Sequence, residues 1–119
     1  MLQLNHKKLE VYKDCLLFVT EVYSLTNKFP DAEKFGLSLQ LKRAAVSVIS
    51  NLAEGSSRSS AKDRKRFLEI SRSSLVEVDT QIEISALLGF IHPEQLQRFH
   101  QFVVNIFISL SAMINKLKT

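Results

Sequence analysis

The segment from Phe35 to Glu54 constrains the fold most strongly, because it leaves an unusually wide apolar arc on a helix. On a helical wheel its polar residues form one stripe of about 100°. This stripe contains Gln40, Arg43, Ser47, Ser50, Asn51 and Glu54, and apart from Ser38 and Lys42 the rest of the arc is apolar. A helix that packs on one side only shows water a wider polar face. We therefore expect this helix to contact its own bundle on one side and another subunit on the other.

Glycine and proline are scarce in this chain, and each one separates apolar segments. The 119 residues include three Gly and two Pro, namely Pro30, Gly36, Gly55, Gly89 and Pro93. That number is too small for the many tight turns of a protein built from short strands. Apolar residues at spacings of three and four predict helices over residues 7–28, 35–54, 61–88 and 93–116.

Short loops between long helices favour antiparallel neighbours. The sequence therefore predicts an all-α fold, an antiparallel up-down-up-down four-helix bundle that forms a single domain over residues 1–119. The predicted helix over residues 93–116 also has a wide apolar arc. Two helices with more apolar surface than one bundle can bury predict a cyclic homo-oligomer.

Several residues are typical of helix ends or helix faces. Asn5 is a candidate N-cap of the first helix. Gly55 suits the left-handed position after the second, and Ser60 with Asp63 fits a capping box at the start of the third. The first helix has one apolar face made of Leu9, Tyr12, Leu16, Val19 and Tyr23, widened on one side by Val11, Cys15, Phe18 and Val22.

Cysteine content and charge placement indicate a soluble protein in a reducing compartment. Cys15 is the single cysteine, so it cannot form an internal disulfide. Charges such as Glu10, Lys13 and Glu21 interrupt the first 30 residues, so neither a signal peptide nor a membrane-spanning helix is predicted. We expect cytoplasmic localisation and no membrane partner.

Basic residues are concentrated around the start of the third predicted helix. Residues 58–72 hold six Lys or Arg against two acids, and the six are Arg58, Lys62, Arg64, Lys65, Arg66 and Arg72. The helix dipole prefers acids in the first turns and bases in the last turns, which is the reverse of this arrangement. A property other than helix stability therefore favours these residues.

In an up-down bundle, the start of the third helix lies at the same end of the molecule as both chain termini, so its bases gather there with the lysines near the termini. We call this set the basic end; it consists of Lys7, Lys8, Arg58, Lys62, Arg64, Lys65, Arg66, Lys116 and Lys118. Two interpretations stay open, a phosphate-binding surface and a solvated surface that aids solubility. No aromatic residue lies between Arg58 and Arg66, so the pattern favours backbone or shape recognition of folded RNA over stacking of single strands. The predicted phosphate contacts are Arg58, Lys62, Arg64, Lys65 and Arg66.

The sequence predicts no catalytic residue, cofactor or metal site. His6, His92 and His100 are far apart and lack acids at ligand spacing. Cys15 lies on an apolar face without a nearby histidine, which is typical of a packed thiol. The serines at positions 56, 57, 59 and 60 fit loop solubility and helix capping better than phosphorylation beside Arg58.

Two further polar groups have open alternatives. Asp79 and Glu83 lie one helical turn apart and form either a carboxylate pair or cation site, or a solvated pair that meets a base such as Arg43 or Arg72. Asn51 and Glu54 either stabilise the corner between the second and third helices by bonding loop amides, or join Arg43 in a surface for a partner.

Several motifs in combination resemble the bacterial four-helix-bundle family of ribosomal RNA intervening-sequence proteins. The resemblance covers about residues 9–91, with two mild departures at Ser73 and Asp79, where the family usually has Gly and Glu. The motifs are Val11-Tyr12, Leu25-Thr-Asn-Lys-Phe-Pro30, Gln40-Leu-Lys-Arg-Ala-Ala45, Ser47, Asn51-Leu-Ala-Glu-Gly55, Arg58, Phe67-Leu68, Ser74-Leu75 and Glu77-Val-Asp-Thr-Gln81.

The resemblance implies an up-down four-helix bundle that assembles as a ring-like homopentamer. Many members of the family are encoded in inserts within genes for 23S ribosomal RNA. The family is also similar to accessory proteins of diversity-generating retroelements, which bind nucleic acid and a reverse transcriptase. The resemblance carries no agreed activity and no catalytic residues.

These observations lead to one main hypothesis and one alternative. The main hypothesis is a non-enzymatic homopentamer that associates with ribosomal or other structured RNA, or another nucleic acid, through the basic end. The alternative is an adaptor or scaffold ring that binds a protein, such as a reverse transcriptase, through the stripe around Arg43, Asn51 and Glu54. An enzyme would need a pocket with a perturbed acid or base, and the sequence contains no such group.

Overall fold

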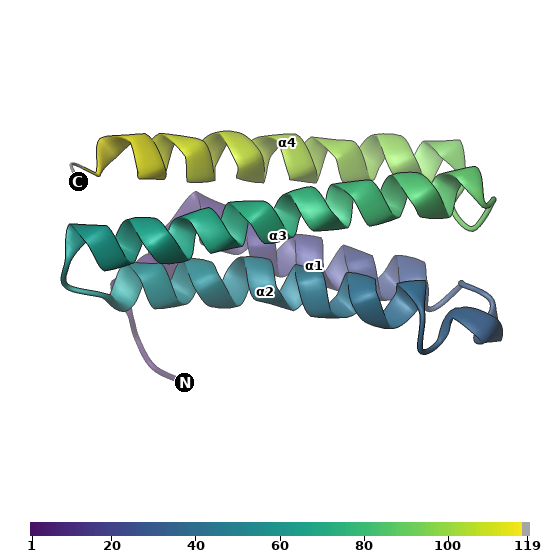
Figure 1. Ribbon diagram of the computed structural model, residues 1–119, viewed down its shortest axis with the longest axis horizontal. Coiled ribbons are helices and arrows are strands. Elements are labelled where there is room, and N and C mark those ends of the chain that lie inside the picture. Colours follow the sequence, from purple (N-terminus) through teal and green to yellow (C-terminus); the bar gives the residue numbers. More distant parts are fainter. Residues whose placement is uncertain (118–119) are drawn as a thin grey trace.

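The computed structural model describes residues 1–117, and four long helices make up most of them (Figure 1). The helices are α1 (Glu10–Thr26), α2 (Leu37–Ser57), α3 (Ala61–Leu87) and α4 (Pro93–Lys116), with short 3-10 turns at η1 (Asn5–Lys8) and η2 (Asp31–Glu33). The described residues contain no strand. The predicted all-α class with four helices is confirmed, and the bounds of α4 match the predicted range.

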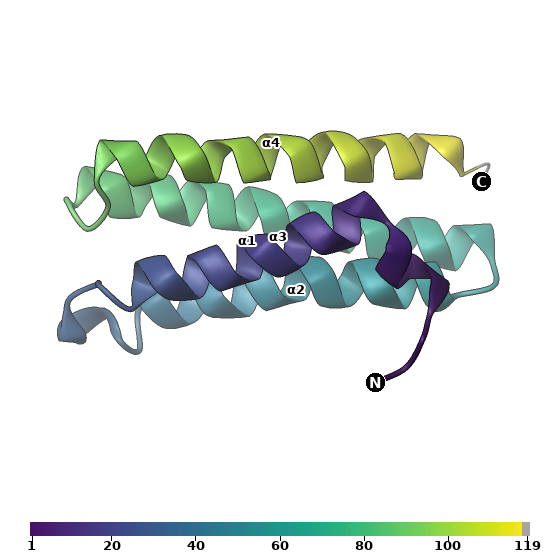
Figure 2. The ribbon, with the colours of Figure 1, turned by 180° about the vertical axis from the view of Figure 1, so that it is seen from behind.

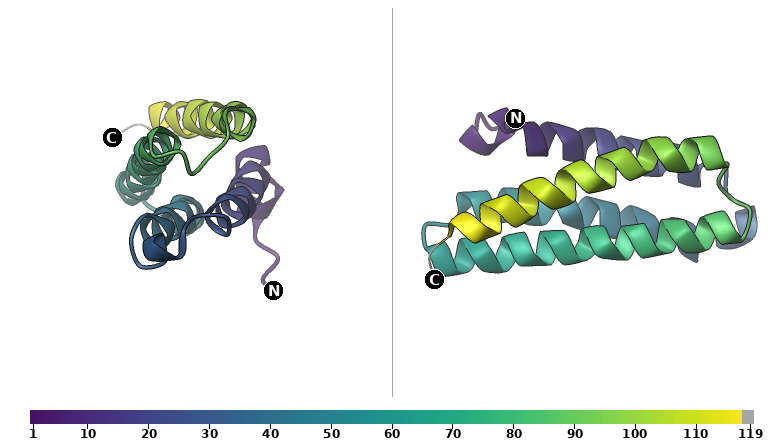
Figure 3. Two further views of the ribbon diagram at one scale, coloured as in Figure 1. Left: turned by 90° about the vertical axis from the view of Figure 1, so that its right-hand side faces the viewer. Right: turned by 90° about the horizontal axis from the view of Figure 1, so that it is seen from above.

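The four helices surround a shared core. α1 packs against α2 and α4, and α3 packs against the same two helices. The end view in Figure 3 shows this square arrangement, with α1 diagonally opposite α3. The connection from α2 to α3 and the last turn of α4 lie at one end of the molecule, and the other two connections lie at the opposite end (Figures 1 and 2).

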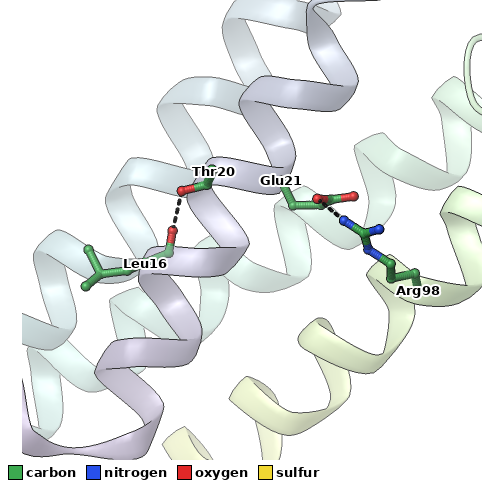
Figure 4. A network of polar contacts seen from close by, with 4 residues as sticks. All are labelled: Leu16, Thr20, Glu21 and Arg98. Atoms are coloured by element: carbon green, nitrogen blue, oxygen red, sulfur yellow. Dashed lines mark hydrogen bonds and ion pairs between the residues drawn. The ribbon is translucent and has the colours of Figure 1, made fainter.

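The core holds aromatic and aliphatic side chains from every helix. Phe18 of α1 and Phe99 of α4 are fully buried and stack with their ring centroids 5.3 Å apart. At the surface of the same helix pair, Arg98 contacts Glu21 at 2.9 Å (Figure 4). Within residues 1–117, no helix combines the length and hydrophobicity that a membrane-spanning segment needs.

The apolar face of α1 separates into two parts in the structure. Val11, Cys15, Phe18 and Val22 are buried in the core. By contrast Leu9, Leu16 and Tyr23 are between 40% and 48% exposed, and they lie on the outside of the bundle. The sequence shows both rows of apolar residues but does not indicate which one points inward, since each row has helical spacing.

α2 and α3 form the most extensive helix pair, and small residues line their contact. Ala44 and Ala45 of α2 and Ser71 of α3 are buried. The Ser71 hydroxyl donates to the carbonyl of Val48 at 2.6 Å, so the buried hydroxyl keeps a hydrogen bond. The hydroxyls of Ser47 and Ser74 lie 2.8 Å apart and add a second polar link between the two helices.

Gly55 corrects one sequence prediction. It lies inside α2 and does not have the left-handed backbone expected of a residue after a helix end; among the described residues only Gly89 has a positive φ, of 82°. What matters at this position is the space left by the absence of a side chain. A Cβ atom at Gly55 would lie 3.1 Å from Cβ of Phe67 and 3.2 Å from the carbonyl oxygen of Arg64. Gly55 therefore allows the end of α2 to approach the start of α3.

The predicted caps have mixed outcomes. Asn5 is not the N-cap of α1, because it begins η1 and α1 starts after Leu9, whose extended backbone ends that turn. The Ser60 hydroxyl accepts a hydrogen bond from the backbone N–H of Asp63 at 3.1 Å, as the sequence predicts for the N-cap of α3.

The Gly55→Ala substitution tests the close approach of α2 and α3. Overpacking against Phe67 and Arg64 costs about 2 kcal/mol, and the better helix propensity of Ala returns about 1 kcal/mol. We expect the free energy of unfolding to fall by about 1 kcal/mol, measured by urea denaturation at matched protein concentration. The control Ser57→Ala, at an exposed position of the same helix, should change it by less than ~0.5 kcal/mol. An equally stable or more stable Gly55→Ala protein would contradict this account.

The thiol of Cys15 should be inert in the folded protein. It is fully buried, and burial, with a smaller contribution from the charge of Asp14, raises its pKa to about 12. Only the thiolate reacts with thiol reagents. We expect reaction with an aromatic disulfide at pH 8 to be on the order of 100-fold slower in the native protein than in guanidinium chloride. Equal rates in the two conditions would show that the thiol is accessible.

Candidate nucleic-acid interface

The predicted phosphate contacts lie on the connection between α2 and α3 and on the first two turns of α3. Arg58, Lys62, Arg64 and Arg66 are exposed, and Lys65 is half-buried. The last turn of α4, which includes Lys116, lies at the same end of the molecule (Figure 2). η1 also lies toward this end, because Lys7 lines a hollow together with Glu54 and Ser57 of α2. Lys118 falls outside the described residues.

Phe67 organises the arginines of this corner. The guanidinium group of Arg58 lies 4.9 Å from the centroid of the Phe67 ring, and that of Arg66 lies 4.6 Å from it. Cations at this distance from an aromatic ring are attracted by its quadrupole. Nε of Arg64 also donates to the carbonyl oxygen of Arg58 at 2.6 Å. These contacts hold three cationic side chains on a small area of surface.

Phe67 has no predicted part in the basic end, because it follows Arg66 directly and lies outside the segment from Arg58 to Arg66. Its adjacency to Arg66 is visible in the sequence, but its contact with Arg58 depends on the α2–α3 connection. The half-buried Phe67 side chain lies with its Cβ beside Gly55, and Arg58 and Arg66 lie over its ring. The close approach at Gly55 and the clustering of the arginines are therefore parts of the same corner.

Glu54 contributes an acid at the edge of this corner. Its carboxylate lies 3.6 Å from Nη2 of Arg58, and both side chains are about half exposed, at 53% and 45%. A solvated ion pair of this kind adds little stability. Glu54 pairs with Arg58 only, and no other base of the basic end has an ion pair with it in residues 1–117.

Asn51 and Arg43 lie apart from that pair. The Asn51 side-chain amide donates to the carbonyl oxygen of Ser47 at 2.8 Å and to its hydroxyl at 3.0 Å. Because the Ser47 hydroxyl in turn meets Ser74, Asn51 belongs to the α2–α3 contact, and the hydrogen bonds described for it do not reach the loop. Arg43 is exposed on α2, three turns away from Glu54.

The carboxylates of Asp79 and Glu83 are exposed beside a hollow of about 540 Å³ between α3 and α4. Arg72, a candidate partner, instead donates to the Ser111 hydroxyl at 3.1 Å and lies 5.8 Å from the Phe107 ring centroid. Within residues 1–117, no ion pair joins Asp79 or Glu83 to a base. In the same part of the chain, no group of three His, Cys, Asp or Glu side chains has a metal-binding arrangement.

Comparisons with known proteins agree on the fold. A crystallised protein of unknown function from the S23 ribosomal protein family of Bacteroides thetaiotaomicron VPI-5482 superposes with a TM-score of 0.81 at 22% identity. The similarity covers 87% of this chain and 97% of that one. Among curated proteins, none matches this chain.

The sequence also matches a family model over almost its whole length. The model describes 23S rRNA-intervening sequence proteins and matches residues 7–116. This match confirms the resemblance seen in the motifs, and it extends beyond residues 9–91 to include α4. The chain therefore belongs to the family of 23S rRNA-intervening sequence proteins.

Proposed function

We propose that this chain is a non-enzymatic protein that binds structured RNA through its basic end, as a homopentamer of antiparallel up-down-up-down bundles. The observation that carries the proposal is the cluster of Arg58, Arg64 and Arg66 around Phe67. Three guanidinium groups on one exposed corner repel each other, and neither folding nor the helix dipole requires them there. Glu54 offsets the charge of Arg58 alone, and a bound polyphosphate chain supplies further negative charge to the cluster.

The position of Phe67 favours a folded RNA over a single strand. Proteins that bind single strands offer open aromatic faces on which bases stack. The Phe67 ring is half-buried, and two guanidinium groups lie over it. It therefore serves the arginines, and the surface offers charge for the phosphate backbone of a structured RNA. The family's association with 23S ribosomal RNA makes that RNA the first candidate.

Assembly strengthens binding at such a surface. One basic end supplies only a few phosphate contacts, which corresponds to weak, salt-sensitive affinity. A cyclic homopentamer places five copies of the basic end on one face, and linked sites bind one RNA with much higher avidity than a single site. A soluble cytoplasmic location, where ribosomal RNA is present, completes the proposal.

Charge reversal at the basic end tests the proposal. We expect the double variant Lys62→Glu, Arg66→Glu to bind a structured 23S ribosomal RNA fragment at least ~10-fold more weakly in fluorescence anisotropy, with the slope against log salt reduced by about two per subunit. The matched control is Lys28→Glu, Lys34→Glu, which reverses two exposed charges at the other end of the bundle and should bind like the wild type. Unchanged binding of the first variant would refute the assignment and favour the protein-adaptor alternative.

Phe67 acts as a positioning residue, and the Phe67→Leu substitution tests that role. Leucine keeps most of the apolar contact but offers no ring to Arg58 and Arg66. We expect RNA affinity to fall several-fold, about 3- to 10-fold, while the salt slope stays the same because every charge is retained. Phe35→Leu is the control, since it removes an exposed ring near Lys34, just before α2 begins and at the end of the bundle opposite the basic end. A Phe67→Leu protein with wild-type affinity would contradict the positioning role.

A further inference from the structure

The exposed apolar row of α1 continues onto α2. Nζ of Lys42 lies 5.2 Å from the ring centroid of Tyr23, and Val46 follows Lys42 by one helical turn. Leu16, Tyr23 and Val46 are each more than 40% exposed. We call this surface the α1–α2 stripe; it consists of Leu9, Tyr12, Leu16, Val19 and Tyr23 of α1 with Lys42 and Val46 of α2.

A second apolar surface lies between α3 and α4. The hollow of about 540 Å³ beside Asp79 and Glu83 and a neighbouring hollow of about 270 Å³ share Asp79 and His100, so they form one continuous groove. Its exposed apolar members include Ile108, which is 62% exposed. We call this surface the α3–α4 groove; it consists of Val76, Asp79, Glu83, Leu87, His100, Phe107 and Ile108.

The two surfaces carry opposite charges. The α1–α2 stripe contains Lys42, whereas Lys13 beside its Leu9 and Leu16 is already paired with Glu10 at 3.7 Å. The α3–α4 groove contains Asp79 and Glu83, which have no ion-pair partner within residues 1–117. Arg72 lies next to the groove but is already engaged with Ser111 and the Phe107 ring. An apolar surface that carries the base Lys42 thus matches an apolar surface that carries two unpaired acids.

The two surfaces lie on opposite sides of the bundle, since α1 and α2 form one side and α3 and α4 the other (Figure 3). One copy therefore cannot bring its own surfaces together. We propose that the α1–α2 stripe of one copy packs into the α3–α4 groove of the next copy, which makes a heterologous contact around the oligomer. This inference rests on the assembly in the proposed function and assigns the surfaces that form it.

Charge also decides against pairing of like surfaces. In an isologous dimer, two stripes would bring the two Lys42 side chains onto one interface, or two grooves would bring four carboxylates together. Like charges juxtaposed at an interface oppose association. A heterologous contact avoids this, and a growing assembly keeps one free stripe at one end and one free groove at the other until the ring closes.

Mixing two interface variants tests the inference. The stripe variant is Leu16→Glu, Val46→Glu, and the groove variant is Val76→Glu, Ile108→Glu; all four positions are exposed in the monomer. We expect each variant alone to have the mass of a single 13.6-kDa chain in multi-angle light scattering, with wild-type helicity by circular dichroism. Mixed in equal amounts, they should form a dimer and stop there, because the mixture has one intact stripe and one intact groove.

The control variant is Ile70→Glu, Ile84→Glu, which alters two exposed apolar residues on α3 outside the groove and should assemble like the wild type. Two monomeric variants that do not associate on mixing would overturn the heterologous pairing. If the stripe variant and the groove variant each assemble like the wild type, the choice of surfaces is wrong, although the proposed oligomer itself stands. A monomeric wild type would overturn both the assembly and this inference, whereas RNA anisotropy on the same sample tests the basic end separately.

If either variant loses its helicity, a charge-exchange experiment replaces the mixing test. We expect the Lys42→Glu oligomer to dissociate at a protein concentration at least ~10-fold higher than the wild type does. The double variant Asp79→Lys, Glu83→Lys should show the same change. The chain that carries all three changes should recover most of the wild-type mass, because both surfaces change sign together. Failure of the combined chain to recover would overturn the pairing.

Discussion

The close contact between α2 and α3 is the constraint on which the rest of this structure depends. Small residues, Gly55 and Ser71 among them, let the two helices approach, and the Ser71 hydroxyl keeps a hydrogen bond of 2.6 Å to Val48. Larger side chains at these positions would separate the helices and open the core. The contact also places the start of α3 against the end of α2, because Gly55 packs directly on Phe67. The pair then offers one common wall against which α1 and α4 pack.

This packing has a consequence for the surface above it. With Phe67 held against Gly55, its ring is available to Arg58 from the loop and to Arg66 from the same helix. The bases therefore do not extend independently into solvent; they are gathered by a ring that the fold positions. Binding and folding share residues at this corner, so a stability measurement and an RNA-binding measurement report on the same contacts. The α3–α4 groove lies along the side of the bundle, whereas the α1–α2 stripe meets the basic end at Tyr12, which lines the same hollow as Lys7.

Much of this architecture was predictable from the sequence, because long periodic segments with few glycines leave little choice of fold. The four helices, the bounds of α4 and the Ser60 cap followed from spacing and capping residues. The role of Gly55 did not, since a glycine near the end of an apolar run is typical of a helix end, and only the tertiary contact shows that space was needed. Likewise, α1 has two apolar rows of equal periodicity, and the choice between them depends on the neighbouring helices. At the basic end, the bases were visible in the sequence but the ring that gathers Arg58 and Arg66 was not.

The measurement that tests the central claim most directly is lysine footprinting with and without a structured 23S ribosomal RNA fragment. The chain carries its own control, because Lys8 and Lys62 belong to the basic end while Lys28 and Lys34 lie near the opposite end of the bundle. Mass spectrometry after brief acetylation reports each lysine separately. Our account predicts that RNA protects Lys8 and Lys62 and leaves Lys28 and Lys34 fully reactive. Equal protection at both ends, or protection of Lys28 and Lys34 alone, would contradict it.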